Sequence, residues 1–255
     1  MKMKAKALVA ALTMGAAMQA NAAIDNFSTG NGELFFNIRD NVNLQSYILD
    51  LNVNLNNFLP SNTTTTNVTY AADANLQNFL GSGSGNYNWS VMAGDSTGGT
   101  VAGDIRYATT TNDSVNVGAN TNIQLVNYRL VDTDLLTNVN GAIGANNSLI
   151  SPSTSPAYDA ASIDTWSNNS PFNATASGVG NSLDFWLLTN SGSTIGTFTK
   201  NNKINVDQYA GQWNLASNGD LSFTSAAPVP LPPAVWLLGS ALVGLVGVGR
   251  RKAAA

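Results

Sequence analysis

The segments GELFFNIRD (Gly32–Asp40) and SYILDLNVNL (Ser46–Leu55) decide the fold class of this chain. Both are rich in aromatic and branched apolar residues, and in the second these partly alternate with polar ones. Such alternation is typical of a strand with one buried face. The DNVN residues between the two segments are turn formers. We therefore predict a β-hairpin near the start of a mainly β protein.

Outward from this hairpin, the rest of residues 23–227 favours short strands and turns, because Asn, Ser, Thr, Gly and Ala dominate and aromatic residues are scattered singly. Two further hairpins are predicted, one from Asp184–Thr189 with Thr194–Thr199 and one from Gln212–Leu215 with Leu221–Phe223. The second of these has an Asn-Gly turn, which suits the positive φ of a tight hairpin. The expected strands are Tyr87–Met92, Ile105–Thr109, Asp184–Thr189, Thr194–Thr199, Gln212–Leu215 and Leu221–Phe223.

Helices are expected at two places. Apolar residues at mixed three- and four-residue spacing predict one at Asn122–Val139, and a shorter one is predicted at Asp73–Leu80, ended by Gly81. No internal repeat and no shift of composition divides the body. The predicted fold is therefore one mainly β domain, an antiparallel β-sandwich or jelly-roll-like arrangement with one or two short helices.

Charge is concentrated at the two ends of the chain. Six of the eleven basic residues are Lys2, Lys4, Lys6, Arg250, Arg251 and Lys252. Between them lie five basic and all fifteen acidic residues, a net charge of −10. Because phosphate binding needs clustered Lys or Arg, the body is not expected to bind nucleic acid. Cysteine and histidine are absent, which excludes disulfides, thiol enzymes, His-containing triads and zinc sites of the usual kind.

The first 22 residues have the three parts of a secretory signal peptide. Three lysines precede an apolar run from Ala7 to Ala17, and Ala20-Asn21-Ala22 follows. Signal peptidase accepts only small side chains at the positions of Ala20 and Ala22. The apolar run is too short to cross about 30 Å of hydrocarbon, which argues against an uncleaved anchor. We therefore expect cleavage after Ala22.

The segment from residue 228 to 252 combines prolines, an apolar stretch and a basic cluster. Pro232 and Pro233 stand at the entry of the predicted transmembrane helix 234–249, where a missing N–H costs nothing. The uncharged stretch Ala234–Val248 would measure roughly 23 Å as a helix and would only marginally span a membrane. The basic cluster is expected to stay in the cytoplasm, so that the body faces the periplasm.

This segment resembles the PEP-CTERM sorting signal, in particular its VPLPA variant, in which a proline-containing signature precedes a short apolar helix and an arginine-rich end. The resemblance covers about the last 25 residues. Two departures are that Leu231 stands where the namesake motif has Glu and that Pro233 is added before Ala234. The matching residues are Val229, Pro230, Leu231, Pro232, Ala234, Val235, Trp236, Leu237, Leu238, Gly239, Ser240, Arg250 and Arg251.

The resemblance implies processing by an exosortase, a membrane-embedded transpeptidase-like enzyme of Gram-negative bacteria that make exopolysaccharide. The implied route is export by the Sec machinery, a transient stay in the inner membrane and transfer to the cell surface or extracellular matrix. Proteins with such tails are similar only in their tails, so the activity of the body is not implied. The alternative is a plain membrane anchor without a sorting step.

Catalytic carboxylates and metal ligands are not evident. Glycosidases use two carboxylates around one bond, whereas the only Glu here is Glu33 and no Asp pair forms a recognisable motif. Asp132 and Asp134 would share a face of a strand but not of a helix. No cofactor is expected, although calcium would suit the Asp and Asn oxygens. Its best local candidates are Asp132 with Asp134, and Asp95 with Asp104 across a glycine-rich loop.

Four tryptophans of the body are the candidates for stacking on sugars. Trp186 and Trp213 lie in expected strands and are expected in the core. Trp166, within SIDTWSNNSPF, is the best candidate for an exposed ligand-binding residue, and Trp89 is the fourth.

Three functions are compatible with the sequence. The first is a non-enzymatic exported protein of the cell surface or polysaccharide (biofilm) matrix, because neutral Asn, Ser and Thr can bond to sugars without screening by salt. The second is a self-assembling adhesin or structural subunit that pairs strand edges. The third is an Asp-based polysaccharide hydrolase. We predict the first.

Overall fold

The computed structural model describes residues 23–25, 30–58, 67–111, 117–143, 147–159, 179–194 and 201–225. The chain divides into two compact units, Met1–Ser225 and Ala226–Ala255, and the second lies wholly outside the described residues. No helix in the described ranges is both long and apolar enough to cross a membrane. The predicted signal peptide and sorting helix fall outside these ranges.

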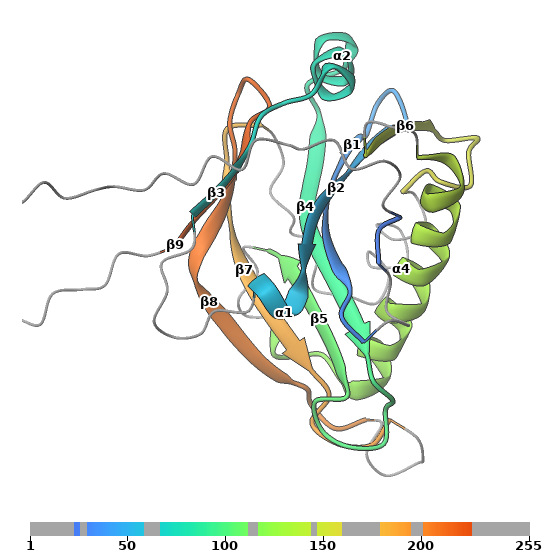
Figure 1. Ribbon diagram of the computed structural model, residues 1–255, viewed down its shortest axis with the longest axis vertical. Helices are drawn as coiled ribbons and strands as arrows, with labels where there is room; N and C mark the ends of the chain where they lie inside the picture. Colours follow the sequence, from blue (N-terminus) through green and yellow to red (C-terminus); the bar gives the residue numbers. More distant parts are fainter. Residues whose placement is uncertain are drawn as a thin grey trace, which may run out of the picture. The chain divides into compact units, whose positions relative to one another are not determined.

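The described strands form one nine-stranded antiparallel sheet in the order β3-β9-β8-β7-β5-β4-β1-β2-β6 (Figure 1). Three helices accompany it in the described part of the chain: α1 (Leu55–Phe58), α2 (Ala74–Ser82) and α4 (Asn122–Ala142). The strands are β1 (Glu33–Asp40), β2 (Gln45–Asn54), β3 (Asn67–Tyr70), β4 (Tyr87–Ser96), β5 (Ile105–Thr110), β6 (Ser148–Pro152), β7 (Ser182–Thr189), β8 (Asn205–Leu215) and β9 (Leu221–Ser225).

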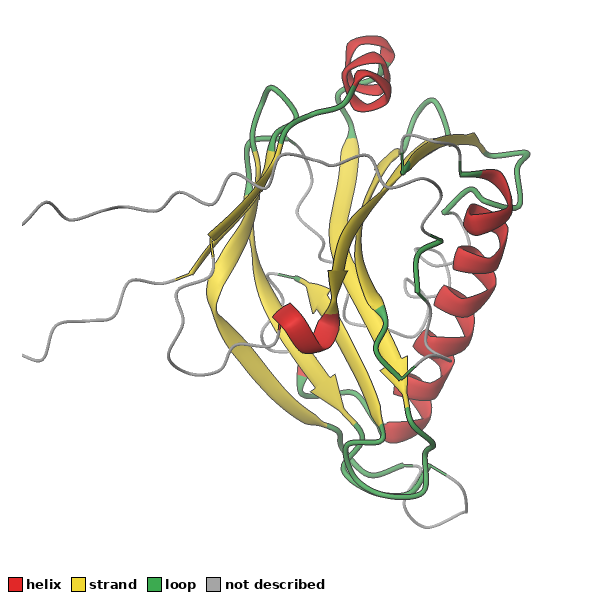
Figure 2. Cartoon of the chain, in the orientation of Figure 1, coloured by secondary structure: helices red, strands yellow, loops and turns green. Residues whose placement is uncertain are grey.

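The prediction of a mainly β fold is confirmed, but the described strands make one curled sheet and not the two packed sheets of a sandwich (Figure 2). Two features favour the curl. The β1–β2 and β7–β8 pairs each contain a register shift, and such bulges bend strands and increase their twist. A strongly curled sheet covers its own inner face, so it needs no second sheet.

Two of the three predicted hairpins are confirmed. β1 pairs with β2, and β8 pairs with β9 across a turn in which Gly219 has a φ of 91°. The hairpin of Asp184–Thr189 with Thr194–Thr199 is wrong, because both edges of β7 are occupied by β5 and β8. Residues 195–199 themselves lie outside the described ranges.

Both predicted helices are confirmed, and each has a cap at its start. The predicted end at Gly81 is wrong, because α2 continues to Ser82. The Asp73 carboxylate accepts a hydrogen bond from the Leu76 N–H at 2.7 Å at the start of α2. Thr121 and Gln124 form a capping box at the start of α4. With 21 residues, α4 is longer than the short helices that we expected.

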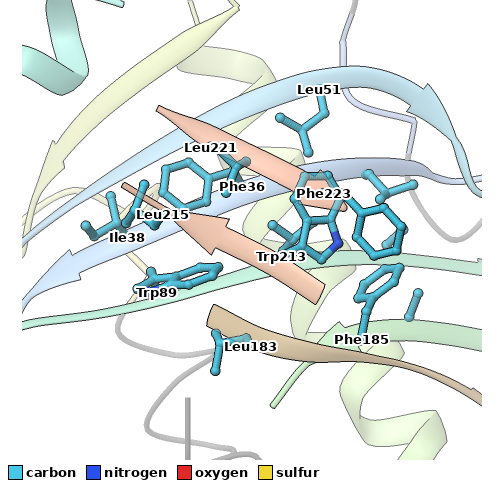
Figure 3. Packing of buried hydrophobic residues seen from close by; sticks show 14 of the residues in the cluster. Phe36, Ile38, Leu51, Trp89, Leu183, Phe185, Trp213, Leu215, Leu221 and Phe223 are labelled. Atoms are coloured by element: carbon cyan, nitrogen blue, oxygen red, sulfur yellow. The ribbon is translucent and has the colours of Figure 1, made fainter. Parts of the chain in front are cut away.

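Apolar residues fill both faces of the sheet, because neighbouring strand residues point to opposite faces. The face that carries Phe35 packs against α4 through Leu125, Tyr128 and Val139. The opposite, concave face carries Phe36 and is filled mainly by large side chains (Figure 3). Both ends of the strand order contribute to this inner core: Leu51 from β2 and Phe223 from β9.

One hydrogen bond connects the two sides of the curl. The Tyr70 hydroxyl on β3, at one edge of the sheet, donates to the carbonyl of Leu51 on β2 at 3.1 Å. Because β6 pairs with β2 only from Gln45 to Leu49, this carbonyl lies beyond the end of that ladder. The Tyr70 side chain therefore connects β3 with β2, two strands that do not pair with each other.

Replacing Tyr70 by phenylalanine is expected to lower the free energy of unfolding by about 1 kcal/mol, because one hydrogen bond is lost and the ring is kept. Urea unfolding measures the change. Tyr209→Phe is the matched control, since its hydroxyl is buried in the inner core without a hydrogen-bond partner. Equal effects of the two substitutions would contradict a closing role for Tyr70.

A buried aspartate anchors the β1–β2 turn. The Asp40 side chain is 1% exposed and accepts hydrogen bonds from the N–H groups of Val42 and Asn43, each at 2.9 Å. It also accepts bonds from the Ser84 N–H at 2.7 Å and the Ser84 hydroxyl at 2.6 Å. Burial would raise the pKa of Asp40, but these bonds lower it to about 2. The carboxylate thus joins the turn to the loop before β4.

Candidate functional site

The residues singled out for sorting, cleavage and sugar binding lie outside the described ranges. They are Ala20, Ala22, Trp166, Val229, Pro230, Leu231, Pro232, Pro233, Ala234, Trp236, Gly239, Arg250 and Arg251. Their roles stay predictions.

The other candidate tryptophans are core residues. Trp89, Trp186 and Trp213 are 1%, 9% and 0% exposed, as expected for the last two from their strands. The Trp186 indole donates to the carbonyl of Thr111 at 3.1 Å. None of the three offers a surface on which a sugar could stack.

The proposed calcium pair of Asp95 and Asp104 is engaged by protein groups. Arg106 forms an ion pair with Asp95, and its Nε lies 2.9 Å from Oδ1. Asp104 Oδ2 accepts the N–H groups of Gly99, Thr100 and Val101 at 2.9, 2.8 and 2.9 Å. These backbone bonds, that from Val101 first, lower the pKa of Asp104. The two carboxylates therefore hold a strand pair and a loop, which argues against a shared calcium ion.

Asp132 and Asp134 both lie in α4. Residues two apart on a helix are rotated by about 200°, so the pair does not share a face. Asp134 is exposed. More generally, the described ranges contain no group of three or more acidic side chains placed to hold a metal ion by themselves.

The polar group that stands out is Asp50 on β2. One residue of β1, Leu34, lies opposite three residues of β2, because Glu33 pairs with Asn54 and Phe35 with Asp50. Within this bulge Asn52 has a φ of 53°, and its N–H donates to Asp50 Oδ1 at 2.7 Å. The pairing with Phe35 puts the Asp50 side chain on the α4 face of the sheet, where it is 3% exposed.

Asn147 lies directly opposite Asp50. The Asp50 N–H donates to the Asn147 carbonyl at 2.9 Å, which continues the β2–β6 ladder beyond the pair of Leu49 and Ser148. This bond holds the backbones of the two residues side by side just beyond the start of β6. Asn147 has a φ of 55°, so this position is a specific backbone feature.

Two oxygen atoms of this facing pair lack a donor. Asp50 Oδ2 and Asn147 Oδ1 are both buried and have no hydrogen-bond partner. A buried acceptor without a partner costs roughly 1–3 kcal/mol, and more when it is charged. Each of these two buried oxygens can therefore still accept a hydrogen bond or bind a cation.

The surroundings of Asp50 are negative. Its pKa is raised to about 7, chiefly by burial and, to a smaller extent, by the carboxylates of Glu33 and Asp25, while the Asn52 hydrogen bond lowers it. Burial and Asp25 also raise the pKa of Glu33, against a backbone bond from Asp25. The basic side chains that the structure describes bind elsewhere: Arg106 to Asp95, Lys203 to the Ala119 carbonyl, and Arg39 over the Tyr158 ring.

The first described residues border this region. Ile24 is 1% exposed and exchanges two hydrogen bonds with the Asn140 side chain on α4, at 2.9 and 3.0 Å. Asp25 exchanges two with Glu33, at 2.9 and 2.8 Å. The segment that follows the predicted cleavage site is thus built into the fold beside Asp50.

In comparisons with known proteins, no family model, no curated protein and no solved structure matches the chain. Sequence reasoning also missed the pair, because Asp50 and Asn147 are far apart in the chain and belong to no motif. The one available signal was an aspartate in the middle of the apolar run YILDL.

Proposed function

We propose that this is a non-enzymatic exported protein that an exosortase-type enzyme sorts to the cell surface or the extracellular polysaccharide matrix. The observation that carries the proposal is the order of the terminal parts: a signal peptide with Ala20 and Ala22, and a tail in which Pro230 and Pro232 precede an apolar stretch and Arg250-Arg251. In a protein with both signals, the N-terminal signal peptide directs export across the membrane and the C-terminal tail holds the exported chain in the membrane.

The limits of the folded unit support this proposal. Within the described residues, the first buried one is Ile24, two positions after the predicted cut at Ala22. The last strand that the structure describes, β9, ends at Ser225, just before the proposed tail from residue 228. The described strands and helices thus lie between the proposed signal peptide, residues 1–22, and the proposed sorting tail, residues 228–252.

The sheet edges favour a matrix protein over a self-assembling subunit. The edge strands β3 and β6 have only four and five residues, and β6 ends in Pro152, which has no N–H to donate. Short edges with proline are a common protection against strand addition. A hydrolase is not favoured by Asp50 either, since a polymer cannot reach a carboxyl that is 3% exposed.

The proposed partners follow from this route. They are the Sec machinery, the inner membrane during transit, an exosortase-type enzyme and extracellular polysaccharide, for which Trp166 is the proposed contact. No nucleic acid is proposed, because the body is acidic.

The proposal is tested in the native cells by fractionation and mass spectrometry. We expect the mature protein to begin at Ala23, to lack its basic end and to be recovered with exopolysaccharide. A variant that carries Pro230→Ala, Pro232→Ala, Arg250→Ala and Arg251→Ala should accumulate in the inner membrane instead.

An Ala254→Ser variant is the control and should be sorted normally. Recovery of the protein in the cytosol from Met1 to Ala255 would refute the export route. A wild-type protein that keeps its tail in the membrane would indicate a plain anchor.

A further inference from the structure

Asp50 Oδ2 and Asn147 Oδ1, which have no hydrogen-bond donor, are suited to binding a positively charged partner. Protein donors are the usual solution for a buried carboxylate, and Asp40 in the same β1–β2 pair shows it, with bonds from Val42, Asn43 and Ser84. Asp50 receives one such bond, from Asn52, and its second oxygen receives none. Asn147, whose carbonyl accepts the Asp50 N–H, likewise has a buried side-chain oxygen, Oδ1, without a donor.

The type of partner follows from the ligand atoms. A carboxylate and an amide oxygen in a negative environment are the ligands of hard cations. Calcium accepts six to eight oxygens in irregular geometry, including Asn and backbone carbonyls, whereas Mg²⁺ requires near-octahedral geometry and keeps its waters. The left-handed φ values of Asn52 and Asn147, 53° and 55°, make this an irregular site. These features favour Ca²⁺.

We propose that Asp50 Oδ2 and Asn147 Oδ1 bind a calcium ion at the end of the β2–β6 ladder, with Glu33 on the neighbouring strand adding negative charge. The ion would neutralise Asp50 and link β2 to the segment that follows α4. Few carboxylates contribute, so the expected dissociation constant is about 10⁻⁴–10⁻³ M, as in extracellular calcium modules. The proposal does not depend on the sorting route.

Thermal unfolding of the full-length chain, stripped of metal by a chelator, tests the site. Calcium at about ten times its dissociation constant should raise Tm by roughly 3–5 °C. Magnesium and sodium chloride at matched ionic strength should leave Tm nearly unchanged. Calorimetric titration with CaCl₂ should give about one site per chain.

Two variants and one control assign the effect to these residues. Asp50→Asn keeps the shape of the side chain, and it should abolish the calcium shift. Asn147→Asp adds a charged ligand and should tighten calcium binding by about tenfold, and it serves as the test if Asp50→Asn does not fold. The control is Asp134→Asn, an exposed site on α4, which should keep the full shift.

Two results would overturn the proposal. One is a wild-type Tm that does not respond to calcium, which would mean that the Asn147 amide is turned to donate to Asp50 and closes the pair without an ion. The other is a calcium shift that persists in Asp50→Asn and in a third variant, Asn147→Ala, which would place the ion elsewhere.

Discussion

Replacing Asp40 by alanine is expected to lower the free energy of unfolding by about 3–4 kcal/mol at neutral pH. The carboxylate is buried and receives bonds from Val42, Asn43 and Ser84. Its loss leaves several N–H groups without a partner and separates the β1–β2 turn from the loop before β4. Urea unfolding at pH 7 measures the effect. Asp207→Asn, an exposed aspartate of β8, is the control and should change stability by less than about 0.5 kcal/mol.

The same residue predicts a specific acid sensitivity. The pKa of Asp40 is about 2 in the folded chain, below the ordinary value of about 3.9 for an unfolded aspartate. A lowered folded pKa stabilises the fold fully above the unfolded value, and this contribution is lost as pH falls from about 4 through 2. Stability of the wild type should therefore decrease over that range more steeply than stability of Asp40→Asn. Parallel pH profiles would show that Asp40 is not the sensitive group.

Replacing Trp213 by alanine is expected to cost about 3–5 kcal/mol of stability, because a large side chain leaves a cavity in a packed core. Trp213 is fully buried and stacks on Phe58 with ring centroids 5.6 Å apart, while Phe185 and Phe223 lie around it (Figure 3). It therefore joins α1 to β7, β8 and β9. Urea unfolding, with near-UV circular dichroism as a second readout, measures the loss.

Two further variants separate packing from other effects. The Trp213 indole N–H has no hydrogen-bond partner, so Trp213→Phe should lose only part of the packing and cost less than Trp213→Ala. Val101→Ala, at a side chain that is 59% exposed, should leave stability nearly unchanged. An alanine variant as stable as the wild type would show that the inner core does not depend on this residue.

The elements that could be predicted from the sequence are those with a local signal. The first hairpin follows from alternation around DNVN, the last from Asn218-Gly219, and α2 from the segment Asp73–Leu80. The predicted partner of Asp184–Thr189 was wrong, because closeness in the chain was taken as a guide to pairing. β7 pairs instead with β5 and β8, at the cost of longer connections.

The candidate site shows the same division. An aspartate within YILDL could be recognised from the sequence as unusual for a strand. Its opposite residue, Asn147, could not be found, because only the pairing of β6 with the far edge of the first hairpin brings them together. Likewise, Arg106 pairs with Asp95 because the β4–β5 register places the two residues opposite each other.

The sequence by itself determined the β character of the chain, its strands and helices with local patterns, and the order of a lysine-apolar start, an acidic body and a proline-apolar-basic end. Those features depend on side-chain periodicity, turn chemistry and partition into membranes, which act over a few residues. Only the tertiary structure decided that the described strands make one curled sheet and that Asp50 faces Asn147. Strand order and burial depend on contacts between distant segments, so no local pattern encodes them.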